Sequence, residues 1–166
     1  PEAVRRGCVV VDESGYWRMD PKVPLVRITR EFAAPPVKVF RAHTDPDLVI
    51  QWLGPNRVEM EIDHFDCRTG GSYRYLHRHD GMEFGFNGCF HLVRPAELII
   101  QTFTFEGMPD DVALERVVVV DLGDGRTRLE ATSLVDSFEG RDAFVSSGME
   151  EGVQEGYHRL DALLAG

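Results

Sequence analysis

Long apolar runs are missing from this chain of 166 residues. No stretch approaches the roughly 20 consecutive apolar residues that a membrane-spanning helix needs, and no secretory leader is visible. The sequence therefore predicts a protein with no membrane span, and we expect it to work in the cytoplasm.

Cysteine and basic residues are also scarce. Cys8, Cys67 and Cys89 are odd in number and show no Cys-x-x-Cys spacing, so we expect free thiols in a reducing compartment. The 18 Lys and Arg residues are outnumbered by 28 Asp and Glu residues, which gives a net charge of −10. No basic stripe is available for phosphates, so we expect no nucleic-acid partner.

Catalytic and metal-binding signatures are absent from the sequence. It contains no Gly-x-Ser-x-Gly elbow, phosphate-binding loop or His-Glu-x-x-His motif. His77 and His79 lie two residues apart and could share one face of a strand, but no third ligand can be placed beside them. We therefore predict no metal, no cofactor and no assigned catalytic residue, and we favour a protein that is not an enzyme.

The length and composition suit one domain with a hydrophobic core. Residues 1–24 have a sequence pattern of their own. A short β-branched run at 8–11 and a second run at 16–19 flank a turn signal. We interpret them as an N-terminal extension, either a hairpin or an arm, and residues 25–166 as the domain.

Alternating apolar residues predict a strand over 25–32, which Pro35 and Pro36 end. Two short helices follow over 36–43 and 45–52, with Asp45 and Pro46 at the start of the second. Evenly spaced strands separated by Gly-rich turns then predict an antiparallel meander over 58–65, 72–79, 84–93, 98–106, 114–122 and 127–135.

Apolar residues at three- and four-residue spacings, with no proline, predict one helix from about 138 to 164, roughly 40 Å long. Gly148, Gly152 and Gly156 form a stripe along it, although each costs a helix about 1 kcal/mol. The stripe favours either close packing of the helix backbone on a sheet or space for a ligand. The predicted fold class is α+β: a curved antiparallel sheet wrapping a long C-terminal helix, with two short helices after the first strand.

Short motifs in this order resemble a known family. They are Arg-Glu-Phe-Ala-Ala-Pro at 30–35, Thr-Asp-Pro at 44–46, Gln-Trp-Leu-Gly-Pro at 51–55, Arg-Thr-Gly-Gly at 68–71, and Gly-Met-Glu-Glu-Gly at 148–152 with Arg159-Leu160. Together they resemble the Hsp90-ATPase-activator-homologue-like (AHSA1-type) branch of the START/Bet v 1-like SRPBCC superfamily, over residues 26–164.

The resemblance implies a helix-grip fold with a ligand-sized cavity between sheet and helix, without a fixed activity. Leu53 and Val153 stand where the family often has tryptophan, which would either shrink the interior or enlarge that cavity. The family name implies regulation of an Hsp90-type chaperone, which a single domain makes the less favoured interpretation.

Alternation places several aromatic and polar side chains on the face that would line the cavity. Tyr73, Tyr75 and His77 share one face, as do Gln101, Phe103 and Phe105, and as do Leu129, Ala131 and Ser133. Such rows describe either a plain core or the wall of an apolar pocket. The predicted ligand-binding residues are Trp52, Tyr75, His77, Phe86, Phe103, Phe105, Met149 and Tyr157.

Three functions follow from this interpretation. The first is binding of a small apolar or amphipathic molecule in the cavity. The second is a cavity enzyme, cyclase- or hydrolase-like, in which His77 or Arg74 would form the polar end of the pocket. The third is a protein-interaction module, and a homodimer formed through an edge strand or the N-terminal arm remains open.

Overall fold

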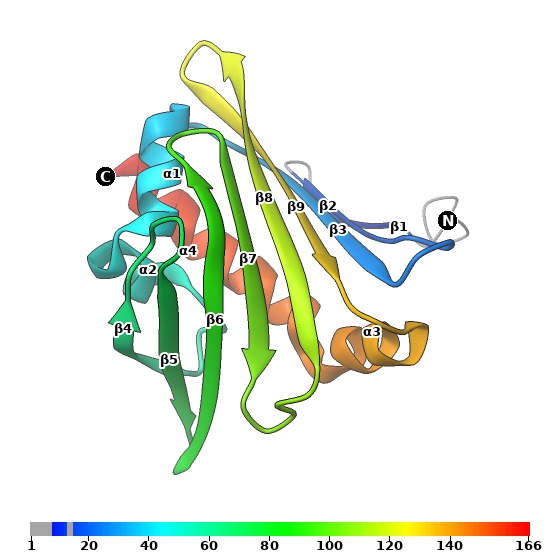
Figure 1. The fold of residues 1–166 in the computed structure, drawn as a ribbon. Helices are drawn as coiled ribbons and strands as arrows, with labels where there is room; N and C mark the ends of the chain where they lie inside the picture. The colour runs from blue at the N-terminus through cyan, green and yellow to red at the C-terminus, as the bar shows by residue number, and fades with distance from the viewer. Residues whose placement is uncertain (1–7, 13–14) are drawn as a thin grey trace.

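Nine strands form one antiparallel sheet in the computed structural model, which describes residues 8–12 and 15–166 (Figure 1). The strand order is β1-β2-β3-β9-β8-β7-β6-β5-β4. After β3 the chain passes through two helices to the far edge and then returns strand by strand until β9 pairs with β3. The predicted meander is therefore confirmed. The strands are β1 (Cys8–Asp12), β2 (Gly15–Met19), β3 (Leu25–Phe32), β4 (Glu59–Phe65), β5 (Ser72–His79), β6 (Met82–Arg94), β7 (Leu98–Phe105), β8 (Val112–Gly123) and β9 (Arg126–Leu134).

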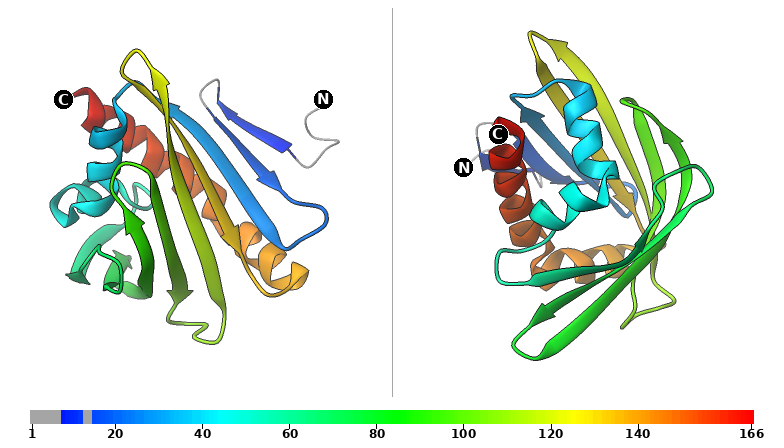
Figure 2. Two further views of the ribbon diagram at one scale, coloured as in Figure 1. Left: turned by 45° about the horizontal axis from the view of Figure 1, so that its top comes forward. Right: turned by 90° about the vertical axis from the view of Figure 1, so that its left-hand side faces the viewer.

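The two short helices follow β3, as predicted. They are α1 (Pro36–Thr44) and α2 (Pro46–Trp52). Asp45 caps α2, because its side chain accepts a hydrogen bond of 3.1 Å from the backbone N–H of Asp47. Figure 2 shows that the helices lie together on the concave side of the curved sheet.

The C-terminal helix is broken, so the expectation of one continuous helix over 138–164 is wrong. It consists of α3 (Phe138–Phe144), a π-helical turn (Val145–Met149) and α4 (Glu150–Ala165). Ser137 caps α3 by accepting a hydrogen bond from the N–H of Gly140. Gly148 adopts φ +88°, a left-handed conformation that favours glycine and interrupts a helix.

The N-terminal segment joins the sheet. β1 pairs with β2, and β2 pairs with β3. Residues 13 and 14, where the sequence predicts a turn, lie outside the described part of the chain. Trp17 on β2 is only 2% exposed, so its ring is part of the core. A boundary between extension and domain at residue 25 stays a prediction.

Within the described residues, no helix is both long and apolar enough to cross a membrane. Cys67 and Cys89 are free thiols, whereas the side chain of Cys8 lies outside the described residues. Burial raises the pKa of Cys67 to about 12, with a further contribution from the charge of Asp66, so this thiol stays protonated at neutral pH.

Two hydrophobic clusters fill the interior. The helical cluster lies between α1, α2, α4 and the β3–β9 part of the sheet; its buried members are Phe32, Ala34, Val39, Ala42, Trp52, Leu129, Tyr157, Leu160 and Leu164. The aromatic cluster lies on strands β5 to β8 and α1; its buried members are Phe40, Tyr73, Tyr75, Phe90, Ile99 and Val119.

Candidate functional site

The C-terminal half of α4 is held firmly against the sheet. Leu160 is 0% exposed, and Leu164 and Tyr157 are also buried. Arg30 on β3, itself buried, donates a hydrogen bond of 2.5 Å to Asp161. Burial and a charge-assisted hydrogen bond therefore fix this end of the helix.

The preceding part of the helix is held much more loosely. Neither α3 nor the π-helical turn contributes a buried residue, and Phe144, Met149 and Val153 are only half-buried. The ring of Phe144 meets Phe103 of β7 with ring centroids 6.1 Å apart. Along this half, apolar side chains of helix and sheet face each other without being sealed from water.

The concave face opposite carries an aromatic wall, which we define as Tyr75, His77, Phe86, Phe103 and Phe105. Phe86 is its centre, with ring centroids 5.3 Å from Tyr75, 5.5 Å from Phe103 and 5.4 Å from Phe105. His77 lies against both Tyr75 and Phe86. These five predicted ligand-binding residues thus come together on three strands.

The other three predicted residues lie elsewhere. Trp52 and Tyr157 belong to the helical cluster, where their rings stack at 6.1 Å. The indole N–H of Trp52 donates a hydrogen bond of 2.8 Å to the carbonyl of Ala42, as expected of a ring that closes one end of the core. Met149 lies in the π-helical turn and is half-buried.

The glycine stripe does not pack on the sheet. A side chain at Gly156 would meet the carbonyl of Trp52 at 3.0 Å, and one at Gly152 would meet Pro55 at 3.5 Å. The second and third glycines therefore let α4 approach the loop after α2. Gly148 has open space around it and instead breaks the helix.

His77, a member of the aromatic wall, also borders this same loop, because a Cβ at Gly54 would lie 2.5 Å from its Cε1 atom. It is 7% exposed, and its Nε2 has no hydrogen-bond partner among the described residues. Burial lowers the pKa of His77 to about 4, and the nearby positive charge of Arg159 contributes to this shift. The imidazole is therefore neutral at pH 7.

A row of polar side chains crosses the concave face beside the aromatic wall. The residues are Gln101, Glu115 and Ser133 on adjacent strands, paired in register across β7, β8 and β9. The amide of Gln101 donates a hydrogen bond of 2.9 Å to Glu115. Ser133 is 6% exposed, and its hydroxyl has no partner among the described residues.

Sequence reasoning missed Glu115. Burial raises its pKa to about 7, while the hydrogen bond from Gln101 acts in the opposite direction. Burial also raises the pKa of the Tyr73, Tyr75 and Tyr157 hydroxyls, and the charge of Glu115 raises all three further. The carboxyl group therefore acts electrostatically on three tyrosines of the interior.

We expect Glu115→Gln to stabilise the fold at high pH. Because the folded pKa is raised above the unfolded value, the stability that the neutral carboxyl contributes is complete below about pH 4.5 and is lost as pH rises through about 7. The amide cannot ionise, so the free energy of unfolding of the variant, relative to that of the wild type, should rise by about 2 kcal/mol between pH 5 and pH 8. This figure is smaller than the pKa shift alone implies, because Glu115 is only half-buried and solvent screens part of the effect. Urea unfolding at both pH values measures this, and an advantage independent of pH would contradict it.

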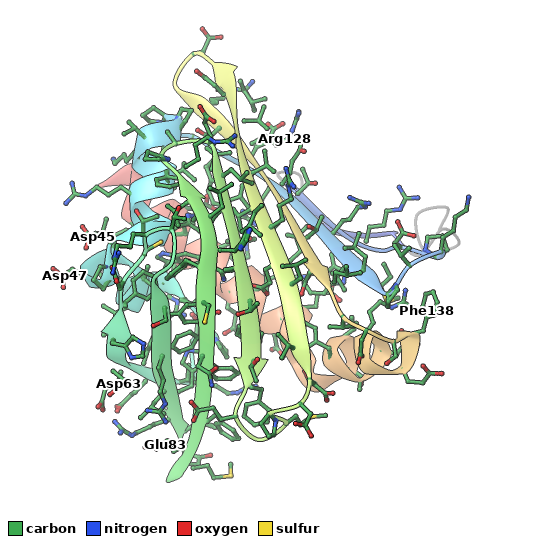
Figure 3. The ribbon with its side chains drawn as sticks, viewed as in Figure 1. Asp45, Asp47, Asp63, Glu83, Arg128 and Phe138 are labelled. Carbon is green, nitrogen blue, oxygen red and sulfur yellow. The ribbon has the colours of Figure 1, made fainter. Side chains whose placement is uncertain are left out.

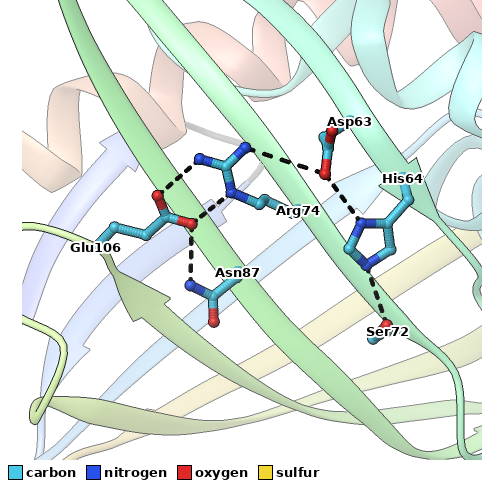
Figure 4. Close-up of polar contacts among 6 residues, drawn as sticks. All are labelled: Asp63, His64, Ser72, Arg74, Asn87 and Glu106. Atoms are coloured by element: carbon cyan, nitrogen blue, oxygen red, sulfur yellow. Dashed lines mark hydrogen bonds and ion pairs between the residues drawn. The ribbon is translucent and has the colours of Figure 1, made fainter.

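Arg74 does not belong to the interior, so its suggested role at the polar end of the pocket is wrong. It alternates with Tyr73 and Tyr75 and therefore lies on the convex face. Figure 4 shows its guanidinium bound to both carboxylate oxygens of Glu106, at 2.7 and 2.9 Å. Asn87 donates to the same carboxylate, and Asp63 lies 4.0 Å from the other side of the guanidinium.

An open hollow of about 530 Å³ lies at the β4 edge of the sheet beside α2. None of the predicted ligand-binding residues lines it. The lining residues are Pro46, Asp47, Ile50, Glu59, Met60, Glu61, Ile62 and Arg78. Arg78, one of these lining residues, forms ion pairs with Glu61 and Glu83.

A curved antiparallel sheet closed around a C-terminal helix defines a helix-grip protein. Residues 33–165 match the family model described as Activator of Hsp90 ATPase homolog 1-like protein (AHSA1), and the chain belongs to this family. No curated protein matches the sequence. Association with an Hsp90-type chaperone and homodimer formation stay predictions.

Solved structures agree with this assignment. A protein from Rhodobacter sphaeroides is 27% identical, with a TM-score of 0.80 over 89% of this chain and 97% of that one. A protein from Arthrobacter aurescens is 25% identical, with a TM-score of 0.82 over 90% of each chain. An AHSA1 protein from Silicibacter pomeroyi, 22% identical over 85% of this chain and 97% of its own with a TM-score of 0.69, shares the fold.

Proposed function

We propose that this protein binds a small apolar or amphipathic molecule between the concave face of the sheet and the α3–α4 helices. The observation that carries the proposal is the uneven burial of the C-terminal helix. Leu160 and Leu164 are buried, whereas Phe144 and Met149 are half-buried opposite an aromatic wall. Partly exposed apolar surface that lies inside a fold favours a ligand that would cover it.

Binding of an uncharged apolar dye such as Nile red tests this proposal. We expect Phe103→Ala to weaken dye binding about tenfold, because a ring buried against a ligand contributes on the order of 1.5 kcal/mol or more. The matched control is Phe138→Ala, which removes a 41% exposed ring at the start of α3 (Figure 3). Equal affinity of both variants and the wild type would refute a site on the aromatic wall.

Catalysis inside the same interior is a second candidate. It is favoured by Glu115, whose carboxyl group has a pKa of about 7 and whose charge acts on the hydroxyl of Tyr157. A carboxyl group that titrates near neutral pH can act as a general acid or base. Native mass spectrometry of freshly purified protein separates the two functions. A carried ligand whose mass stays unchanged on incubation supports binding, whereas conversion that Glu115→Gln abolishes supports catalysis.

A further inference from the structure

The polar row on the concave face has the chemistry of a specific ligand group. Gln101, Glu115 and Ser133 are direct neighbours on three strands, and paired residues of an antiparallel sheet lie about 4.5–5.5 Å apart at their Cα atoms. Each side chain carries an oxygen that can accept a hydrogen bond. Ser133 is only 6% exposed, and its hydroxyl has no hydrogen-bond partner within the described residues. This row therefore has unused hydrogen-bonding capacity.

The carboxyl group of Glu115 also lacks a cation. Among residues 8–12 and 15–166, no Lys, Arg or His forms an ion pair with it; its only hydrogen bond there comes from the neutral amide of Gln101. Two basic residues of the interior have other partners. Arg30 binds Asp161, and Arg159 donates to the backbone carbonyls of Trp52 and Gly54.

The surroundings favour a positive charge over a negative one. The charge of Glu115 acts on Tyr73 and Tyr75 of β5, and aromatic faces attract ammonium groups. The ring of Tyr157 on α4 already carries a cation, the guanidinium of Arg30, 5.7 Å from its centroid. A net charge of −10 on the chain attracts organic cations and repels organic anions.

We propose that the molecule bound in this interior is an amphipathic amine, whose ammonium group is held by Glu115, Ser133 and Gln101 while its apolar part lies against the aromatic wall. This inference rests on the proposed function. A primary ammonium has three N–H donors, which match the three acceptors of the row. The ion pair would supply the partner that Glu115 lacks, and the hydroxyl of Ser133 would accept one of the remaining hydrogen bonds.

Amine binding should be linked to the ionisation of Glu115 and therefore depend on pH. The ammonium favours ionised Glu115, so binding near pH 7 should displace the proton that burial holds on the carboxyl group. His77, which belongs to the aromatic wall, is neutral above about pH 4, and the three tyrosines stay protonated. Proton release on binding should therefore come from Glu115 alone.

The test is isothermal titration calorimetry with phenylbutylamine and its uncharged counterpart phenylbutanol at about pH 8. We expect the wild-type protein to bind the amine about tenfold more tightly than the alcohol, as a charge-assisted contact implies. Glu115→Gln should abolish this preference, so that the amine and the alcohol bind with affinities within about twofold of each other. Glu130→Gln, which removes a carboxylate that is paired with Arg128, should leave the preference unchanged.

The outcomes separate the two proposals. Equal or tighter binding of the alcohol to the wild type would overturn the amine inference and leave ligand binding intact, whereas binding of neither probe would overturn both. At pH 7 the heat of amine binding should vary with the ionisation enthalpy of the buffer in the wild type and not in Glu115→Gln. A wild-type heat without that dependence would also contradict the inference. Ser133→Ala, expected to weaken the amine severalfold more than the alcohol, is the second variant.

Discussion

Leu160→Ala should lower the free energy of unfolding by about 3 kcal/mol. Leu160 is 0% exposed and packs in the helical cluster that fixes α4 on the sheet. Truncating a fully buried leucine removes its transfer free energy and leaves a cavity, and together these cost about 2–5 kcal/mol. Urea unfolding followed by circular dichroism measures the loss.

The matched control is Met149→Ala, a truncation of similar size in the half-buried π-helical turn. We expect it to cost about 1 kcal/mol or less, because little apolar surface is removed from water there. Equal losses from the two variants would mean that the C-terminal helix is packed evenly along its length. Such a helix would leave no apolar surface for a ligand, and the proposed function would lose its main support.

Gly54→Ala should be the second strongly destabilising change, at about 3 kcal/mol. Gly54 has φ +95°, and a Cβ there would lie 2.5 Å from the Cε1 atom of His77. The left-handed conformation alone costs a non-glycine residue roughly 1–2 kcal/mol, and displacing a buried ring adds to this. The variant should also loosen Arg159, which donates a hydrogen bond to the carbonyl of Gly54.

Two comparison variants separate these contributions. Gly81 also has a positive φ, +75°, but no atom lies within 4 Å of a Cβ there, so Gly81→Ala should cost only about 1 kcal/mol. In the background of His77→Ala, the cost of Gly54→Ala should fall toward that value, because the clash is gone. Additive losses in the double variant would show that the imidazole is not what Gly54 accommodates.

Most of the fold could be predicted because local signals and the fold agree. Leu25–Phe32 and Ser72–His79 are strands with the bounds that their alternation indicates, and Asp45-Pro46 starts α2 as its capping chemistry predicts. The break at Gly148 could not be predicted in this way. The helical period continues on both sides of it, and glycine at an interior position has the same sequence signal whether its φ is negative or positive.

The candidate site could be predicted only in part. Strand alternation brought Tyr75, His77 and Phe86 to one face, and the same rule should have placed Arg74 on the other. The inward orientation of Glu115 was not predicted, because it precedes the run Val117–Val120. Four consecutive valines show no alternation of apolar and polar residues from which the inward face could be assigned. The loop contacts of Trp52, Gly54 and Gly156 depend on how α4 crosses α2, which no local pattern encodes.

The most direct test of a ligand site between sheet and helix is to locate a bound probe by intermolecular NMR contacts. With phenylbutanol bound, we predict nuclear Overhauser effects from its methylene protons to the rings of Phe86, Phe103 and Phe144. Contacts to Ile50, Met60 and Ile62 would instead place the probe in the hollow at the β4 edge. That result would contradict the account and leave the aromatic wall as plain core.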